Sequence, residues 1–150
     1  MRTIIRHSWL AIFATACLSA GSAPRQEGAI NAALAHYASA VQHGPVDSLV
    51  ACYEPDGTLE LPGMDVLRGR EAIKQFLLPL TRAVEVKSVS LTSQSLAVHG
   101  ETAEQSGEFR QVAGPPNGAT QEFHGRFHAS WKRGDDRQWR LARLVMQPDR

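Results

Sequence analysis

This sequence has no excess of positive or negative charge and no cluster of basic residues. Its 150 residues contain 16 Lys and Arg against 15 Asp and Glu, which leaves a formal net charge of +1 at pH 7. The basic residues are scattered rather than gathered into a stripe, so nucleic acid is not an expected partner. With 43% hydrophobic and 21% charged residues, the composition is typical of one globular domain with one core.

Long hydrophobic runs are also missing, apart from one of about ten residues at positions 9–18, whereas a membrane span needs about 20. This run follows a short basic start and precedes small residues at 20–23, a pattern typical of a removable export signal. We therefore expect residues 1–23 to be an export signal and residues 24–150 to be a periplasmic or secreted domain. Cys17 loosely resembles the cysteine of a bacterial lipoprotein box, so a lipid anchor stays open, and no other membrane attachment is expected.

Cysteine is scarce, because the chain has only Cys17 and Cys52. If the signal is removed beyond Cys17, a single cysteine remains and an intrachain disulfide is excluded. Cys52 lies among apolar residues at helical spacing, which is typical of an inert buried thiol rather than of a nucleophile. Stability must therefore come from packing.

Motifs for common reactions are absent as well. The sequence has no Gly-x-Ser-x-Gly elbow, no phosphate-binding glycine-rich loop and no Cys-x-x-Cys pair, so no cofactor is expected. His124 and His128 would lie about 13 Å apart on a strand, and His36 and His43 about 10 Å apart on a helix, too far to share a metal ion. No metal is expected, and the row of His124, Arg126 and His128 is interpreted as the outer face of a sheet, either solvated or in a dimer contact.

Helical periodicity dominates the first half of the chain. Apolar residues at helical spacing predict a first helix that ends near Gly44. A second, short helix is expected from Pro45, ending at a turn over residues 55–57 before a short strand over 58–61. A third helix is expected over residues 69–80, broken late by a proline.

From residue 84 onward the hydrophobic period changes to two, which indicates strands. A phase slip at Ser88 suggests a bulge or bend in the first of them. The clearest strand covers residues 123–132, and turn residues on both sides predict antiparallel neighbours over 102–112 and 138–147. Helices followed by an antiparallel meander make an α+β fold.

Three short motifs support a family resemblance. They are Gly44-x-x-Asp47, Tyr53-x-x-Asp56-Gly57-Thr58 and Gly69-Arg-Glu-Ala-Ile73, in this order. Together with the helices and aromatic-rich hairpins they resemble the nuclear transport factor 2 (NTF2) superfamily, most closely its SnoaL-like and DUF4440 type, over roughly residues 27–148. The resemblance implies an NTF2-like cone, with three N-terminal helices packed in a strongly curved antiparallel sheet, a pocket at the open end and a homodimer formed through the sheet.

The ketosteroid isomerases belong to the same superfamily and allow a comparison of sites. Tyr37 falls where those enzymes keep a hydrogen-bonding tyrosine. Their general-base aspartate, which precedes a proline, corresponds to Leu61 before Pro62, and their second acid maps near Phe127. Since both carboxylates are missing at these positions, isomerisation by that mechanism is not expected.

The ligand site predicted from these observations is an apolar pocket with one main polar contact. Tyr37 is either a core residue or the hydrogen-bond donor to a ligand. Small residues at 125 and 129 on the aromatic strand leave space for a ligand or, equally, for a closely packed helix. The predicted ligand-binding residues are Tyr37, Tyr53, Leu61, Phe123, Phe127 and Trp131.

Three functions are compatible with this sequence. The first is binding of a small hydrophobic organic molecule without turnover. The second is an isomerase, cyclase or dehydratase acting on a polyketide-like or steroid-like substrate, with Tyr37 polarising a carbonyl and Glu60 or Asp65 accepting a proton. The third is a dimerisation or protein-interaction module that uses the outer face of its sheet.

Overall fold

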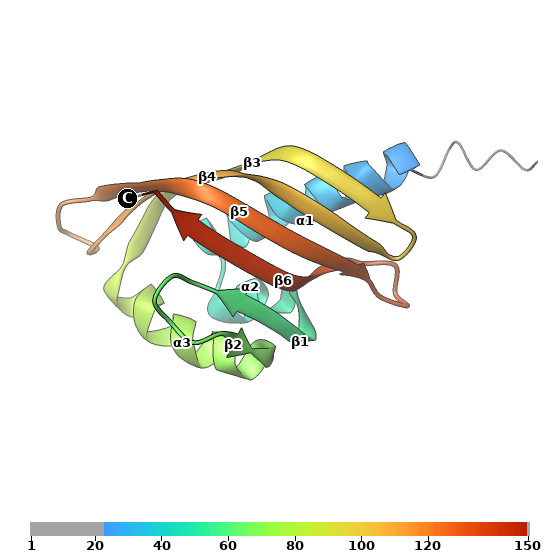
Figure 1. The fold of residues 1–150 in the computed structure, drawn as a ribbon. Coiled ribbons are helices and arrows are strands. Elements are labelled where there is room, and N and C mark those ends of the chain that lie inside the picture. The colour runs from blue at the N-terminus through green and yellow to red at the C-terminus, as the bar shows by residue number, and fades with distance from the viewer. Residues whose placement is uncertain (1–22, 150) are drawn as a thin grey trace, which may run out of the picture.

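The computed structural model describes residues 23–149, which form three helices and six strands (Figure 1). The predicted export signal lies, except for Ala23, outside these residues. No helix among the described residues has the length and hydropathy of a membrane span. In chain order, the elements are α1 (Ala23–His43), α2 (Val46–Ala51), β1 (Tyr53–Glu60), β2 (Leu67–Arg68), α3 (Gly69–Ala83), β3 (Glu85–His99), β4 (Thr102–Gly114), β5 (Gln121–Arg133) and β6 (Trp139–Pro148).

The first two helices follow from the predicted periodicity. The apolar stripe of α1 is buried, including Ile30 and Tyr37. The helix ends at its predicted place, where the N–H of Gly44 donates to the carbonyl of Ala40 at 3.0 Å. Pro45 then precedes α2 with φ −65°, a conformation that its ring imposes. Two buried aliphatic residues of α2, Leu49 and Val50, face the core.

Two boundary predictions are wrong. Residues 55–57, predicted as a turn, lie inside β1, because tertiary pairing with β6 overrides local turn chemistry. The pairing is irregular between Tyr53 and Thr58, and a Cβ at Gly57 would come within 2.7 Å of the carbonyl oxygen of Leu141. The proline expected to break the third helix lies within α3, which continues to Ala83.

The sheet has the order β2-β1-β6-β5-β4-β3. Its β3–β6 meander is antiparallel as predicted, and a register shift between Val86 and Ser88 confirms the predicted bulge. The sheet as a whole is mixed rather than antiparallel, because β1 and β6 run parallel. These two strands are distant in sequence, so no hairpin constrains their direction. The predicted α+β fold, with helices followed by a curved sheet, is confirmed.

Two glycines on neighbouring strands allow the sheet to bend over the helices, which lie on one side of it in Figure 1. A Cβ at Gly107 would collide with the carbonyl of Thr92, and one at Gly125 would collide with the backbone of Gln147 in β6. Residue 125 therefore does not leave space for a ligand, because the β6 backbone fills it.

A buried polar network joins α1 to the sheet. Gln105 is fully buried, and its side-chain amide donates to Asn31 Oδ1 at 2.9 Å and to Ser93 Oγ at 3.0 Å. Its carbonyl oxygen accepts the indole N–H of Trp131 at 2.9 Å. All hydrogen-bonding groups of this side chain are satisfied, so the network fixes how α1 sits on β3, β4 and β5.

Candidate functional site

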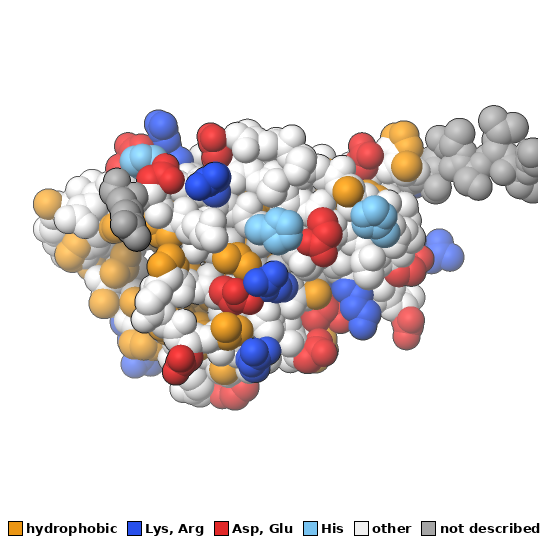
Figure 2. Space-filling view, in the orientation of Figure 1, with side chains coloured by type: hydrophobic (Ala, Val, Ile, Leu, Met, Phe, Trp, Pro, Cys, Tyr) orange, Lys and Arg blue, Asp and Glu red, His pale blue; other side chains and the backbone are white. Residues whose placement is uncertain are grey.

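A cavity of about 330 Å³ lies between the helices and the inner face of the sheet. Every helix and every strand except β2 contributes to its wall. The open side is at the end of the molecule where α3 finishes and β3 begins, and hydrophobic side chains gather at that end in Figure 2. Leu80 and Phe123 mark this side, because they line the cavity while remaining 41% and 43% exposed.

The lining is mostly aliphatic and aromatic. Its apolar residues are Val41, Leu49, Leu59, Leu61, Phe76, Leu77, Leu80, Val84, Val86, Val89, Leu91, Ala113, Phe123 and Met146. Three lining residues carry polar side chains, Tyr37, Thr81 and Gln111. No acidic, basic or histidine side chain among the described residues lines this cavity. The wall can therefore desolvate an apolar molecule and form a few hydrogen bonds, but it offers no strong proton acceptor.

Tyr37 contacts a second buried tyrosine. Its hydroxyl lies 3.2 Å from that of Tyr53, and the two rings meet edge to face with centroids 5.9 Å apart. Tyr53 is fully buried, and among the described residues its hydroxyl has only Tyr37 as a hydrogen-bond partner. Each hydroxyl has one proton, so if Tyr53 donates to Tyr37, Tyr37 can donate its own proton into the cavity.

Burial keeps both tyrosines neutral. It raises the pKa of Tyr37 to about 12, even though the hydrogen bond from Tyr53 acts in the opposite direction. The pKa of Tyr53 is raised well above its ordinary value, also mainly by burial. At neutral pH both tyrosines therefore keep their protons, so the pair can form hydrogen bonds but cannot act as a base.

The structure brings together only some of the predicted ligand-binding residues. Tyr37, Leu61 and Phe123 line the cavity. Tyr53 lies behind Tyr37 and is not part of the wall. Phe127 and Trp131 are buried in the core away from the cavity, the first against Gly107 and the second bonded to Gln105. Both side chains face the inside of the sheet, as the alternation of side chains along a strand requires. Their position along β5, however, decides whether an inward-facing side chain lines the cavity.

The two carboxylates considered as proton acceptors lie outside the cavity lining. Glu60 accepts Arg143 Nε at 2.7 Å and Nη2 at 3.0 Å, and this pairing lowers the pKa of the carboxyl. Its neighbour Leu59 faces inward, so alternation along β1 sends Glu60 to the other face. Asp65 is exposed in the connection between β1 and β2.

Several wall residues were not predicted as site residues. They come from α3, β3 and β6 and include Leu77, Val89 and Met146. The alternation of Val84, Val86, Val89 and Leu91 is visible in the sequence, but it cannot show that β3 closes one side of a cavity.

The outer face of the sheet carries the predicted polar row. His128 Nε2 lies 2.8 Å from Glu104 Oε2, which also accepts the hydroxyl of Ser130 at 2.8 Å. His124 Nε2 lies 3.7 Å from Asp149 Oδ2. Figure 2 shows histidine, basic and acidic side chains interspersed on one face of the molecule. Among the described residues, no group of three or more His, Cys, Asp or Glu is placed to hold a metal ion.

With this fold and site established, the chain is recognised as a member of the SnoaL-like domain family, which matches residues 24–145. The family lies in the NTF2-like superfamily, in agreement with the resemblance of the sequence motifs. The Steroid Delta-isomerase of Nocardioides simplex is 33% identical over 114 residues, covering 71% of this chain and 92% of that protein.

Solved structures agree with this assignment. A ketosteroid isomerase-like protein from Erwinia carotovora atroseptica has a TM-score of 0.73 at 16% identity, covering 82% of this chain and 95% of its own. A scytalone dehydratase-like protein from Novosphingobium aromaticivorans has a TM-score of 0.74 at 14% identity, covering 86% of this chain and 87% of its own. At these identities the similarity concerns the fold alone.

Proposed function

We propose that this protein binds a small, uncharged, hydrophobic organic molecule in the cavity and that the Tyr37 hydroxyl donates a hydrogen bond to its polar atom. The observation that carries the proposal is the composition of the wall, which combines many apolar side chains with one buried phenol and has no charged group among the described residues. A cavity of about 330 Å³ lies at the small end of the range for ligand pockets.

A ketone with a polycyclic or steroid-like body is the ligand class that we propose. A carbonyl oxygen accepts the proton that Tyr37 can offer, and the rest of such a molecule needs only apolar contacts. The similarity to a protein named Steroid Delta-isomerase supports this class. The same similarity also supports a second candidate function, the isomerase among the isomerase, cyclase and dehydratase alternatives.

The catalytic alternative needs a proton acceptor near the ligand. Glu60 is paired with Arg143, and neither Glu60 nor Asp65 lines the cavity. Leu61, in the position of the missing general base, contributes only methyl groups to the wall. These contacts favour binding over turnover, and an assay of steroid isomerisation on any compound found to bind tests the alternative directly.

A thermal-shift titration tests the binding proposal. Steroid and polycyclic ketones are compared with hydrocarbons of the same skeleton, because a ligand at 100 times its dissociation constant stabilises the folded state by about 2.7 kcal/mol. Tyr37→Phe should weaken ketone binding about three- to tenfold, since one hydrogen bond is lost, and should leave hydrocarbon binding unchanged. Equal weakening for both compounds, or no shift across a broad panel, contradicts the proposal.

We further propose that the chain is exported, with residues 1–23 as a removable signal, and that it forms a homodimer through the outer face of the sheet. The basic start and apolar run support export. Mass spectrometry of the secreted or periplasmic protein would locate the new N-terminus and show any lipid on Cys17, and light scattering after gel filtration would give the oligomeric state. A protein-interaction role of that same face is the alternative if no small molecule binds.

A further inference from the structure

A second concave surface lies near the opposite end of the molecule from the cavity mouth. It is a groove of about 480 Å³ between the N-terminal half of α1 and the hairpin that joins β5 to β6. We call it the hairpin groove. It shares no lining residue with the cavity. In Figure 1 the β5–β6 turn lies at the right end, and the β4–β5 connection next to the cavity mouth lies at the left.

The floor of the hairpin groove is apolar. α1 presents Ala29, Ala32 and Ala33 to it, and these short side chains leave the space that longer ones would fill. Trp131 and Trp139 line the other side, but they expose little surface to the groove, because they are only 2% and 7% exposed. An apolar or aromatic body can therefore lie over the alanines, whose side chains are exposed or partly exposed.

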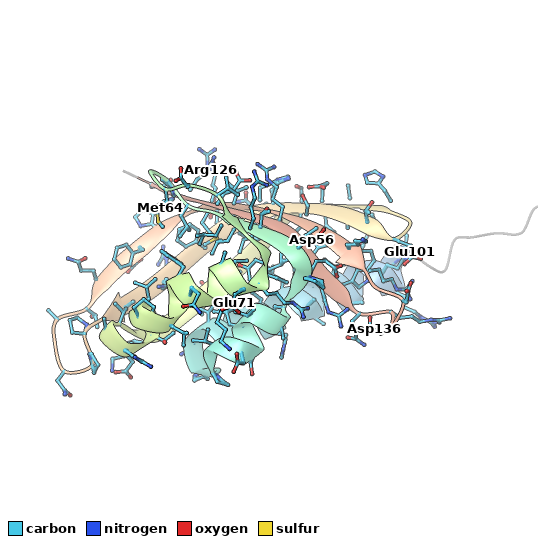
Figure 3. The ribbon with its side chains drawn as sticks, turned by 90° about the horizontal axis from the view of Figure 1, so that it is seen from below. Asp56, Met64, Glu71, Glu101, Arg126 and Asp136 are labelled. Carbon is cyan, nitrogen blue, oxygen red and sulfur yellow. The ribbon has the colours of Figure 1, made fainter. Side chains whose placement is uncertain are left out.

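The rim of the hairpin groove carries basic side chains. Arg137, Arg140 and His36 line it, and no carboxylate among the described residues does so. Arg140 is already neutralised, because its Nη1 donates to Asp136 Oδ1 at 3.0 Å. Arg137 differs, since no acidic side chain of the described chain lies within 4.0 Å of its guanidinium. Figure 3 labels Asp136 at this end of the molecule.

The backbone at Arg137 is unusual for an arginine. Its φ is 63°, the only positive value for a non-glycine residue in the described chain. The turn requires this conformation, because two backbone hydrogen bonds close it. The N–H of Arg137 donates to the carbonyl oxygen of Gly134 at 2.9 Å, and the N–H of Gly134 donates to the carbonyl oxygen of Gln138 at 2.9 Å. Glycine or asparagine would adopt it more easily. An arginine here places an unpaired charge beside the apolar floor in spite of that cost.

We propose that the hairpin groove binds a small organic carboxylate with an apolar body. The carboxylate contacts the guanidinium of Arg137, which can donate two parallel hydrogen bonds to it. The apolar body covers the alanines of α1. This site shares no lining residue with the cavity, for which we propose uncharged ligands.

The test uses two probes of the same shape, 2-naphthoate and the uncharged 2-naphthalenemethanol. Each is titrated into the purified, nitrogen-15-labelled protein, and the indole N–H signal of Trp139 and the amide signals of residues 134–140 are followed by NMR. We expect 2-naphthoate to shift these signals and the alcohol to bind at least about tenfold more weakly, because a hydrogen bond to a charged group is lost.

Two variants at one position provide the control. Arg137→Gly removes the charge and suits the left-handed turn, so it folds, and we expect it to weaken 2-naphthoate binding at least about tenfold. Arg137→Lys keeps the charge and should retain more of the affinity than the glycine variant. The proposal is overturned if both probes bind equally, if Arg137→Gly binds 2-naphthoate as the wild type does, or if the shifts occur only around Tyr37 and Leu61. Absence of any shift at millimolar 2-naphthoate overturns it as well.

Discussion

The hydroxyl groups of Tyr37 and Tyr53 lie 3.2 Å apart, one at the wall of the cavity and the other behind it in the core. Tyr53 has no other hydrogen-bond partner among the described residues, so its orientation depends on Tyr37. For the ligand binding that we propose, the pair would couple stability to recognition, because Tyr37 can donate its proton to a ligand only while Tyr53 donates its own to Tyr37.

Removing either hydroxyl should reveal this coupling. Tyr37→Phe and Tyr53→Phe each leave a buried hydroxyl without its partner, which we expect to lower the free energy of unfolding by about 1–3 kcal/mol. The double variant should be destabilised by less than the sum of the two single effects, because it leaves no orphaned group. Urea unfolding of the four proteins measures this. Strict additivity would show that the hydroxyls do not interact in solution.

Alkaline pH should destabilise the protein through the same residues. The pKa of Tyr37 is raised to about 12 in the folded state, so the folded protein keeps a proton that the unfolded chain loses near pH 10. Stability is therefore full below about pH 10 and falls as the pH rises toward 12, by up to about 1.4 kcal/mol per pH unit for each such tyrosine. The chain contains only two tyrosines, so absorbance at 295 nm follows both. Tyrosinate formation in the folded protein near pH 10 would contradict this assignment.

Glu60→Gln should leave cavity binding unchanged. The Glu60 carboxylate is bonded to Arg143 and does not line the cavity. The loss of this partly exposed pair should lower the free energy of unfolding by less than about 1 kcal/mol. Since the pairing lowers the carboxyl pKa, its contribution is present above the ordinary pKa of a glutamate and disappears as the pH falls. A loss of any turnover in this variant would instead favour the enzyme hypothesis.

Gln105→Leu should be strongly destabilising. The substitution leaves the indole N–H of Trp131 buried without its acceptor and removes the bonds to Asn31 and Ser93. We expect the free energy of unfolding to fall by about 2–4 kcal/mol. Gln94→Leu, at an exposed position of β3, is the matched control and should change stability by less than about 0.5 kcal/mol. Similar values for the two variants would show that the network contributes little.

Arg137→Gly should stabilise the fold. Glycine adopts the left-handed conformation at φ 63° without the cost of about 1 kcal/mol that a side chain incurs there. Thermal unfolding should move to a higher temperature. Gly100→Ala makes the opposite change at a turn residue with φ 64° and should destabilise by a similar amount. A lower unfolding temperature for Arg137→Gly would mean that Arg137 makes stabilising contacts in solution.

Much of the fold can be predicted from local patterns in the sequence. Hydrophobic periods of 3.6 and 2 separate the helices from the strands, and the phase slip at Ser88 locates a real bulge in β3. These features depend on neighbours within a few residues, which is why a single sequence reveals them. The motifs around Gly44 and Gly69 then point to the family.

The features that local patterns could not decide concern contacts between distant residues. Residues 55–57 have the composition of a turn, yet pairing with β6 draws them into a strand. Space beside Gly125 could not be judged without knowing that the β6 backbone occupies it. Phe127 and Trp131 share a face with Phe123, but of the three only Phe123 lines the cavity, because they lie at different positions along β5.

The sequence by itself determined where most of the helices and strands lie, which of their faces are apolar and which family the chain belongs to, because these features depend on spacing along the chain. Only the tertiary structure decided that Glu60 is paired with Arg143 from 83 residues away. It also decided that, among residues 23–149, no charged side chain lines the cavity and no acidic side chain pairs with Arg137 beside the alanines of α1. Each of these features depends on contacts between elements that are distant in sequence, and the curvature of the sheet determines which elements come into contact.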